Sequence, residues 1–464
     1  MGILGLVNTM LLTRLLEDQK VYAMYGLMHQ FVTTAAMFVS FGFDAAYARF
    51  YYQHNQSQWR YLLKVLLIPV ILFVVLAAVL LEPNQWIVQY IFETELTWVA
   101  LLLFLMYMFF TFIHRFTQLT ARMEECALNY VLSNFIGRFG FVIIIAAVFF
   151  LLGKVSFDWV LISSLLGAVL ATLLNLWILI RLKNVSSLEV DSISNRMMMA
   201  YGVPIMINNL FILVMPLIER LIIRDLAGWE VLGIYTAAAV FQTVVMLLVN
   251  TVDNIWNPLV FKHCDEPQKF KPIMHNFGLA VSVIVVLGFA ACVLLRRWLV
   301  LLLGSDYYEV YIIAPAICFG TCFRLVTMIY SAGIHIAKKT VHFIVEPIIQ
   351  MVLSLVLCFC LIKPMGLVGV GIAVTTSVIV SRIYRTIIGL RLYDTGTSEY
   401  KMWMLMGVCT VVSFASLFFV SVVADVIMFV VLIASALLIL NKDLRIVIRT
   451  TKTLMSSKKK TKTE

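Results

Sequence analysis

Charged residues are scarce in this 464-residue chain. Asp, Glu, Lys and Arg make up 13% of it, whereas a soluble protein of ordinary composition has about a quarter. Phosphate-binding glycine loops, G-x-S-x-G motifs and dinucleotide-binding fingerprints are also missing. The eight cysteines form no CxxC pair, and no His, Cys and carboxylate pattern has the spacing of metal ligands. These absences argue against an enzyme or ATPase and predict no cofactor and no metal.

Long hydrophobic runs dominate the chain instead. Hydrophobic residues make up 62% of it, and the mean hydropathy is +0.98. A transmembrane helix needs about 20 apolar residues, so we expect an all-α polytopic membrane protein with about 14 spans. The first segment lacks a basic stretch and a cleavage site, which favours a spanning helix over a signal peptide. The expected segments are 1–16, 21–46, 60–81, 97–117, 126–152, 157–180, 197–223, 231–256, 273–295, 309–334, 340–362, 366–390, 401–423 and 425–441.

Basic residues are distributed unevenly between the loops. If the N-terminus is cytoplasmic, that side of the membrane holds roughly three times as many Lys and Arg residues as the other, in agreement with the positive-inside rule. We therefore expect a multi-pass plasma-membrane protein with both termini in the cytoplasm. The basic tail 443–464 is interpreted as an anchor that touches anionic lipid. Because no basic folded domain accompanies it, nucleic acid is not an expected partner.

The chain repeats itself with an offset of about 210 residues. Short matching stretches at 13–16 and 219–222 are each followed by a helix and a basic end. The pattern predicts two six-helix lobes, related by an axis along the membrane normal, with the substrate site between them. The expected organisation is an N-lobe 1–181, a cytoplasmic linker 182–195, a C-lobe 196–391, two extra helices within 400–442 and the tail 443–464.

Three arginines lie deep inside the hydrophobic segments: Arg138, Arg324 and Arg382. A charge at mid-bilayer is costly and usually faces a polar partner or a water-filled cavity. Guanidinium groups match phosphate oxygens, so these residues are candidates for binding an anionic substrate, with Arg138 and Arg324 facing one central cleft. Alternatively, each arginine caps a neighbouring helix or pairs with a carboxylate, and Arg382 could snorkel to the interface.

Other polar residues extend the candidate substrate site. Arg14 and Arg220 are related by the repeat, and they could form an outer gate or simply anchor their helices at the interface, Arg220 beside Glu219 or Asp225. Asn209 and Asn254 are candidates for cavity lining, where amide groups could bind sugars or hold helices together.

Three carboxylates are candidates for coupling transport to a proton or sodium gradient. Asp44, Asp253 and Glu346 lie within or at the ends of the predicted helices. The alternative is a set of static ion pairs. In these, Glu346 pairs with Arg382 or Lys338. Asp44 and Asp253 pair with Arg49 and Lys262, the basic residues that follow them.

The order and spacing of several short motifs resemble the polysaccharide-biosynthesis flippases, which share a superfamily with the lipid II flippases and the multidrug and toxin extrusion transporters. The resemblance covers 1–391, and it departs from the family at Glu219, where Asp is usual. The motifs are Leu12-Thr13-Arg14-Leu15-Leu16, Tyr201-Gly202-Val203-Pro204, Glu219-Arg220, Gly233-Ile234-Tyr235, Trp256-Asn257-Pro258, Gly304 with Tyr307, Ala337-Lys338-Lys339-Thr340 and Gly366-Leu367-Val368-Gly369.

The resemblance implies a flippase with a cationic central cavity. Its substrate would be an undecaprenyl-pyrophosphate-linked oligosaccharide, moved to the outer leaflet of the bacterial plasma membrane for O-antigen, capsule or exopolysaccharide synthesis. Polymerase and glycosyltransferases of the same pathway would be its partners. The alternatives are a lipid II flippase, a drug or cation antiporter of the same fold, and a scaffold for the polymerase. An antiporter would need unpaired acidic residues at mid-membrane, where this chain has arginines.

The two extra helices, 401–423 and 425–441, have no counterpart in the repeat. Small residues on them permit close packing, namely Gly407, Ser413, Ser416, Ala434 and Ser435. We expect these helices to pack beside the C-lobe and form one wall of a lateral groove for the lipid. They could equally add bulk or an oligomer contact.

Overall fold

The computed structural model describes residues 2–16, 18–51, 58–124, 126–181, 194–263, 267–337, 339, 341–393 and 400–440. Over these residues the regular secondary structure is helical throughout. Residues 182–193 of the predicted linker 182–195, and the predicted tail 443–464, lie outside the described residues.

The chain divides into two compact units. The first unit comprises Val7–Gly233, and the second comprises Ile234 onward together with Met1–Leu6. The division falls inside the 69-residue helix α9 and not at the linker that separates the predicted lobes. The predicted lobes rest on the repeat, and their boundaries and symmetry axis stay a prediction.

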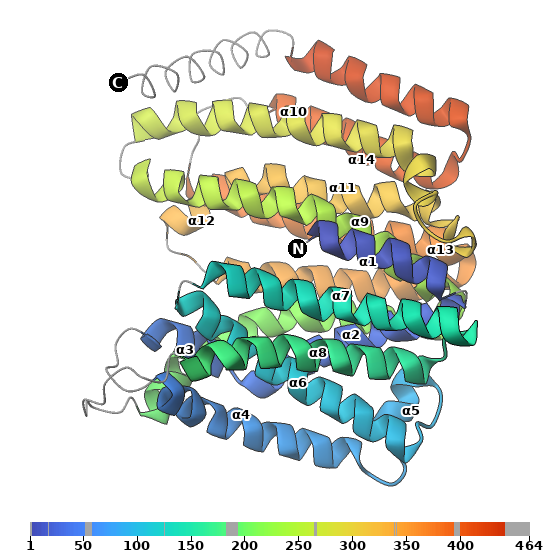
Figure 1. Ribbon diagram of the computed structural model, residues 1–464. Helices are drawn as coiled ribbons and strands as arrows, with labels where there is room; N and C mark the ends of the chain where they lie inside the picture. Colours follow the sequence, from blue (N-terminus) through green and yellow to red (C-terminus); the bar gives the residue numbers. More distant parts are fainter. Residues whose placement is uncertain are drawn as a thin grey trace, which may run out of the picture. The chain divides into compact units, whose positions relative to one another are not determined.

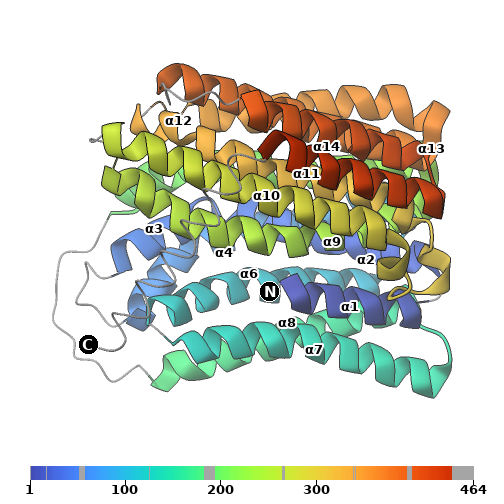
Figure 2. The same ribbon diagram turned by 90° about the horizontal axis from the view of Figure 1, so that it is seen from above.

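The first unit is built on α6, which packs against α2, α7 and α8 (Figure 2). Thr97 caps the start of α6 by accepting the backbone N–H of Ala100, as N-cap residues commonly do. The helices of this unit are α1 (Gly2–Leu15, of which Val7 onward belongs here), α2 (Gln19–Ser40), α3 (Phe43–Phe50), α4 (Gln58–Leu80), α5 (Trp86–Phe92), α6 (Trp98–Met123), α7 (Ala127–Leu152), α8 (Phe157–Arg181) and the first part of α9 (Asn195–His263).

The second unit is built around α11, which is 89% buried over its most apolar stretch. Helices α10, α13 and α14 pack against it (Figure 1). The helices here are the rest of α9, α10 (Pro267–Val300), the short 3-10 helix η3 (Ser305–Tyr307), α11 (Val310–Tyr330), α12 (Ala332–Ile336), α13 (His342–Leu392), α14 (Tyr400–Phe418) and Val422–Leu440.

Large apolar side chains cover the outside of several helices. On α4, Leu63, Leu67, Ile71 and Val74 are all exposed, and their spacing places them on one face. Such a stripe would be an aggregation hazard in water and is suited to contact with lipid. The protein is therefore a multi-pass membrane protein, as its composition predicts.

The number of spans differs from the expected number. Among the described residues, ten helices are long and apolar enough to cross a membrane, or eleven if the pair α2 and α3 counts as one bent span. Two of the ten cover 66 and 51 residues, because α9 and α13 each continue through a non-helical glycine, Gly228 and Gly366. Every one of the predicted segments overlaps a helix. The all-helical fold class is confirmed, whereas the total of 14 spans is not.

A glycine contact holds the bend between α2 and α3. The two helices meet at 61°, and Gly42 at the bend has a φ of 77°, which a residue with a side chain rarely adopts. A Cβ atom on Gly202 of α9 would lie 2.1 Å from the carbonyl oxygen of Gly42. The close approach of these backbones explains why the Tyr201-Gly202-Val203-Pro204 motif needs its glycine.

The two extra helices pack on the second unit. Met402, Leu405 and Leu432 belong to its buried core. The small residues do not all serve this packing, since Ser413 and Ser416 are buried whereas Gly407 and Ala434 are exposed. The lipid groove stays a prediction.

A buried ion pair fixes the turn between the extra helices. The side chain of Arg296 on α10 is fully buried and pairs with the buried carboxylate of Asp425. It also donates to the carbonyl oxygens of Ser416 and Phe419, each at 2.7 Å. The neighbouring Arg297 donates to the carbonyl oxygen of Val420.

Candidate functional site

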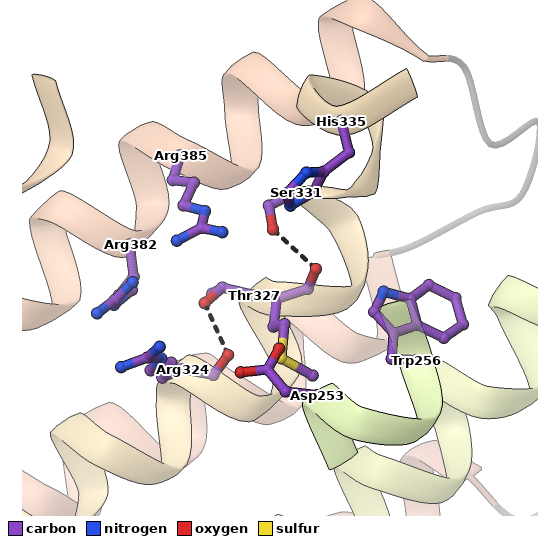
Figure 3. Close-up of a pocket in the computed structure, with 9 residues that line it drawn as sticks. Asp253, Trp256, Arg324, Thr327, Ser331, His335, Arg382 and Arg385 are labelled. Atoms are coloured by element: carbon purple, nitrogen blue, oxygen red, sulfur yellow. Dashed lines mark hydrogen bonds between the residues drawn. The ribbon is translucent and has the colours of Figure 1, made fainter. Parts of the chain in front are cut away.

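A cavity of about 130 Å³ lies in the second unit, among α9, α11, α12 and α13. We call it the second-unit cavity, and Figure 3 shows its lining residues. Three guanidinium groups reach it, one from α11 and two from α13. Its lining residues are Asp253, Trp256, Arg324, Thr327, Met328, Ser331, His335, Arg382 and Arg385.

Two of these guanidinium groups are held by one buried carboxylate. Arg382 and Arg385 lie three residues apart and therefore share one face of α13. Glu346, near the start of the same long helix, forms ion pairs with both. Its Oε2 accepts from Nη1 of Arg385 at 2.9 Å, and the ring of Phe343 lies 4.5 Å from the Arg385 guanidinium. These contacts place two positive charges side by side.

The third guanidinium is less constrained. Nη1 of Arg324 lies 4.0 Å from the Sδ of Met246, which is a weak acceptor. The carboxylate of Asp253 points toward Arg324 (Figure 3). Among the described residues, Asp253 has no ion pair within 4.0 Å. The Arg324 guanidinium is thus available to a ligand.

The charges around this cavity favour an anion. Three arginines face it, and Asp253 with the ion-paired Glu346 supplies two negative charges. Arginine stays charged when it is buried, and its planar fork binds phosphate oxygens with two hydrogen bonds. Burial also raises the strength of such contacts by excluding water. The arrangement can therefore bind a phosphate or pyrophosphate group.

His335 at the rim adds a group that can change charge. It lies on α12, and its pKa is lowered, first by burial and then by the positive charge of Arg385. An anion bound nearby would oppose both effects and raise the pKa again.

The first unit contains a second cavity, of about 190 Å³, which we call the first-unit cavity. Arg138 of α7 lines it, together with polar and aromatic side chains from α1, α2, α6 and α8. Tyr25 stacks on Phe141 with ring centroids 5.0 Å apart. His29 Nδ1 lies 3.0 Å from the hydroxyl of Tyr107. Among the described residues that line this cavity there is no carboxylate.

A sequence profile described as polysaccharide biosynthesis protein matches residues 1–263, which is more than half of the chain. The chain belongs to the polysaccharide biosynthesis protein family. The match includes the whole first unit and α9 through to its last residue. No curated protein sequence matches the chain.

Solved structures show the same fold. A multidrug resistance MATE family transporter of the MOP superfamily, in an inward-facing conformation, superposes with a TM-score of 0.67 at 14% identity, over 85% of this chain and 96% of that one. The lipid II flippase MurJ, in an inward closed conformation, superposes with a TM-score of 0.60 at 13% identity, over 96% of this chain and 97% of that one. A MOP superfamily transporter from Pyrococcus furiosus, whose binding pocket has reverse polarity, superposes with a TM-score of 0.50 at 15% identity, over 86% of this chain and 95% of that one. These three solved structures are transporters and a flippase.

In this polysaccharide biosynthesis protein the three predicted arginines all reach cavities. Arg138 lines the first-unit cavity, and Arg324 and Arg382 line the second-unit cavity. The ion pair expected between Arg382 and Glu346 is confirmed. A role of the arginines in substrate binding stays a prediction, as does a shared central cleft for Arg138 and Arg324.

The candidate coupling carboxylates have different environments. The expected pairing of Asp44 with Arg49 is wrong, because α6 runs beside α3 and places the Arg115 Nε 2.9 Å from the carboxylate. Asp253 lines the second-unit cavity. Its expected partner Lys262 has a side chain outside the described residues.

The remaining predicted site residues line neither cavity. Asn254 is exposed and does not line the cavity that its neighbour Asp253 lines, because successive residues point to different faces of a helix. Asn209 is half-buried and lines neither cavity. Arg14 is exposed near the end of α1. Arg220 donates to Oε1 of Gln30 at 2.7 Å, and a gate formed by these two arginines stays a prediction.

Sequence reasoning missed Arg385, Thr327, Ser331 and His335 at the second-unit cavity. Arg385 lies near the end of a predicted span, where positive charge is ordinarily a sign of the cytoplasmic side. Its distance of three residues from Arg382 was the signal that could have found it, because that spacing places both side chains on one helix face.

Proposed function

We propose that this protein is a flippase that moves an undecaprenyl-pyrophosphate-linked oligosaccharide from the inner to the outer leaflet of the bacterial plasma membrane for surface polysaccharide biosynthesis. The observation that carries the proposal is the meeting of Arg324, Arg382 and Arg385 at one cavity inside a membrane protein of this family. The second-unit cavity would hold the pyrophosphate.

The physical problem of such a substrate is its polar middle. A pyrophosphate or a sugar that enters hydrocarbon loses its hydrogen bonds with water, at a cost of several kcal/mol for each group. Guanidinium groups at mid-membrane replace those bonds and also neutralise the charge. The lipid tail has no such cost and can stay in the bilayer while the headgroup passes.

Alternating access is the proposed mechanism. The cavity would open first to the cytoplasmic side, where glycosyltransferases of the pathway assemble the glycan, and then to the outer side, where a polymerase uses it. Both termini would then lie in the cytoplasm, as the excess of basic residues on that side predicts. The helices α14 and Val422–Leu440 would form a wall of the groove in which the lipid moves.

Coupling to a proton or sodium gradient is the proposed energy source. Asp253 and Glu346 are the two carboxylates beside the cavity arginines. A cation or proton that neutralises one of them would strengthen the positive potential of the cavity toward the anionic substrate. Asp44, which is paired with Arg115, is a weaker candidate because it lines neither cavity.

A lipid II flippase is the second candidate. The superposition on MurJ covers nearly the whole of both chains, but at this identity it supports the fold alone. The family match favours the oligosaccharide substrate. A drug antiporter is disfavoured because the second-unit cavity has three arginines and one carboxylate in its lining.

Arg324 gives the sharpest test, because Glu346 pairs with the other two arginines. We expect Arg324→Ala to weaken the binding of inorganic pyrophosphate to the purified protein by roughly tenfold to a hundredfold, the usual worth of a charge-assisted hydrogen bond. Arg324→Lys should restore part of the affinity, because an ammonium lacks the fork. Arg196→Ala, which removes an exposed arginine at the start of α9, is the matched control and should bind normally.

Alanine variants of the cavity arginines also test the biological role. In a host that lacks its own copy, Arg138→Ala or Arg324→Ala should abolish surface polysaccharide while the protein accumulates in the membrane at the normal level. Normal polysaccharide from the double variant, at a normal protein level, would contradict the proposal.

A further inference from the structure

The first-unit cavity has chemistry that differs from that of the second-unit cavity. It has one arginine, Arg138, and the rest of its lining is uncharged amides, hydroxyls, imidazoles and aromatic rings. Because the described part of the lining has no carboxylate, the cavity does not suit a metal cation or an amine. A ligand for this cavity must donate hydrogen bonds to these uncharged groups and accept hydrogen bonds from them.

Two polar atoms in its wall have no partner. The Oδ1 of Asn8 on α1 and the Oγ of Ser164 on α8 are buried and form no hydrogen bond with the described residues, and their side chains belong to residues that are 8% and 5% exposed. Buried polar atoms are nearly always satisfied, and each exception costs about 1–3 kcal/mol. Because both residues line the cavity, a polar occupant of the cavity would satisfy them.

Aromatic rings form part of the wall. Tyr25 and Phe141 stack on each other beside Arg138, and His29 with Tyr107 forms a hydrogen-bonded pair next to them. Such a surface offers an apolar face and polar edges together. The best ligand would have the same two properties, an apolar face on one side and hydroxyl groups around its edge.

We propose that the first-unit cavity binds one sugar ring. A pyranose presents C–H groups on its face for Tyr25 or Phe141, and its hydroxyls both donate and accept toward Asn8, Ser164 and Asn134. The volume of about 190 Å³ corresponds to roughly six water molecules and is below the range of drug-sized sites, so one ring fits and a chain of sugars does not. The inference rests on the proposed function, since the ring would belong to the glycan of the substrate.

The test uses the purified full chain and free monosaccharides. Glucose, N-acetylglucosamine and glucuronate at millimolar concentration would be followed by saturation-transfer NMR. We expect transfer to at least one of them, and about tenfold weaker binding in the Asn8→Ala, Ser164→Ala double variant, because two hydrogen bonds are lost. Ser413→Ala is the matched control, since it removes another buried hydroxyl without a partner, on α14 and outside the cavity. It should bind like the wild type.

The outcomes separate this inference from the proposed function. A preference for glucuronate would indicate a sugar acid held by Arg138. Equal binding of glucose would indicate a neutral ring. Either result supports the site. No transfer from any of the three sugars, or unchanged binding by the double variant, would overturn it and leave water as the occupant. Pyrophosphate binding by the same samples, and its loss in Arg324→Ala, reports on the proposed function alone. Thermal melts of each variant show whether it is folded.

Discussion

Among single residues, Asp253 stands out because its negative charge repels the proposed anionic ligand. Its carboxylate shares the second-unit cavity with three arginines and points toward Arg324 (Figure 3). A fixed negative charge there repels an incoming anion and also keeps Arg324 partly neutralised when the cavity is empty. We interpret Asp253 as an internal counter-ion that the substrate must replace.

Replacing Asp253 should therefore strengthen anion binding. Removing a charge several ångströms from the ligand is worth about 1–2 kcal/mol at the effective dielectric constant of a protein, so Asp253→Asn should bind inorganic pyrophosphate about tenfold more tightly. Calorimetric titration of wild type and variant measures this. The neighbouring exposed residue provides the control, Asn254→Ala, which should leave the affinity unchanged. Weaker binding by Asp253→Asn would show instead that the carboxylate orients Arg324.

At the scale of elements, glycine contacts explain two of the short motifs in the sequence. Gly202 allows α9 to touch the bend at Gly42, and a Cβ on Gly233 would lie 3.0 Å from the carbonyl oxygen of Gln19. Each of these two glycines thus marks a place where two backbones meet. Motifs of this kind report helix packing and carry no information about the glycan.

Gly202→Ala should destabilise the protein. Its new methyl group would lie within 2.1 Å of a backbone oxygen, so α9 or the bend must move, at a cost of about 1–3 kcal/mol. The midpoint of thermal unfolding in detergent should fall by several degrees. Gly288→Ala is the matched control, because a Cβ there meets nothing within 4 Å and alanine favours helix. An equal midpoint for both variants would refute the contact.

The helices were predictable because long apolar runs can bury their backbone groups in only a few ways. All fourteen predicted segments overlap a helix. The breaks at Gly228 and Gly366 are so short that α9 and α13 each count as one long helix. The cavities were less predictable. Arg138, Arg324 and Arg382 could be identified from the cost of isolated charge, but Arg385 and His335 lie near helix ends, where polar residues are ordinary. Asp44 paired with Arg115 through tertiary contact between helices, which sequence proximity does not reveal.

At the scale of the whole molecule, the extra helices are part of the core of the second unit. Met402, Leu405 and Leu432 are buried in it, and Arg296 depends on Asp425 for its charge partner. A chain that ends at residue 399 would expose this core and leave a buried arginine unpaired, which costs about 3–5 kcal/mol. The extra helices are therefore needed for stability, whether or not they line a lipid groove.

Two truncations test this dependence. A chain that ends at residue 399 should fail to accumulate in membranes, whereas one that ends at Leu440, which keeps both extra helices, should accumulate close to the wild-type level. Quantitative immunoblots of membrane fractions compare them. Normal accumulation of the shorter chain would show that the second unit folds without the extra helices. The lipid groove is then better examined by point substitutions on exposed faces than by deletion.

The buried pair of Arg296 and Asp425 also affects how α10 enters the membrane during synthesis. The two residues are 129 positions apart, and at five to twenty residues per second roughly 6–26 s pass between their synthesis. For that time α10 carries an arginine whose partner does not yet exist, and a buried charge without its partner is costly. We expect α10 to wait near the membrane surface or within the insertion machinery until the final hairpin emerges. The hairpin that contains Asp425 therefore completes the burial of a helix made long before it.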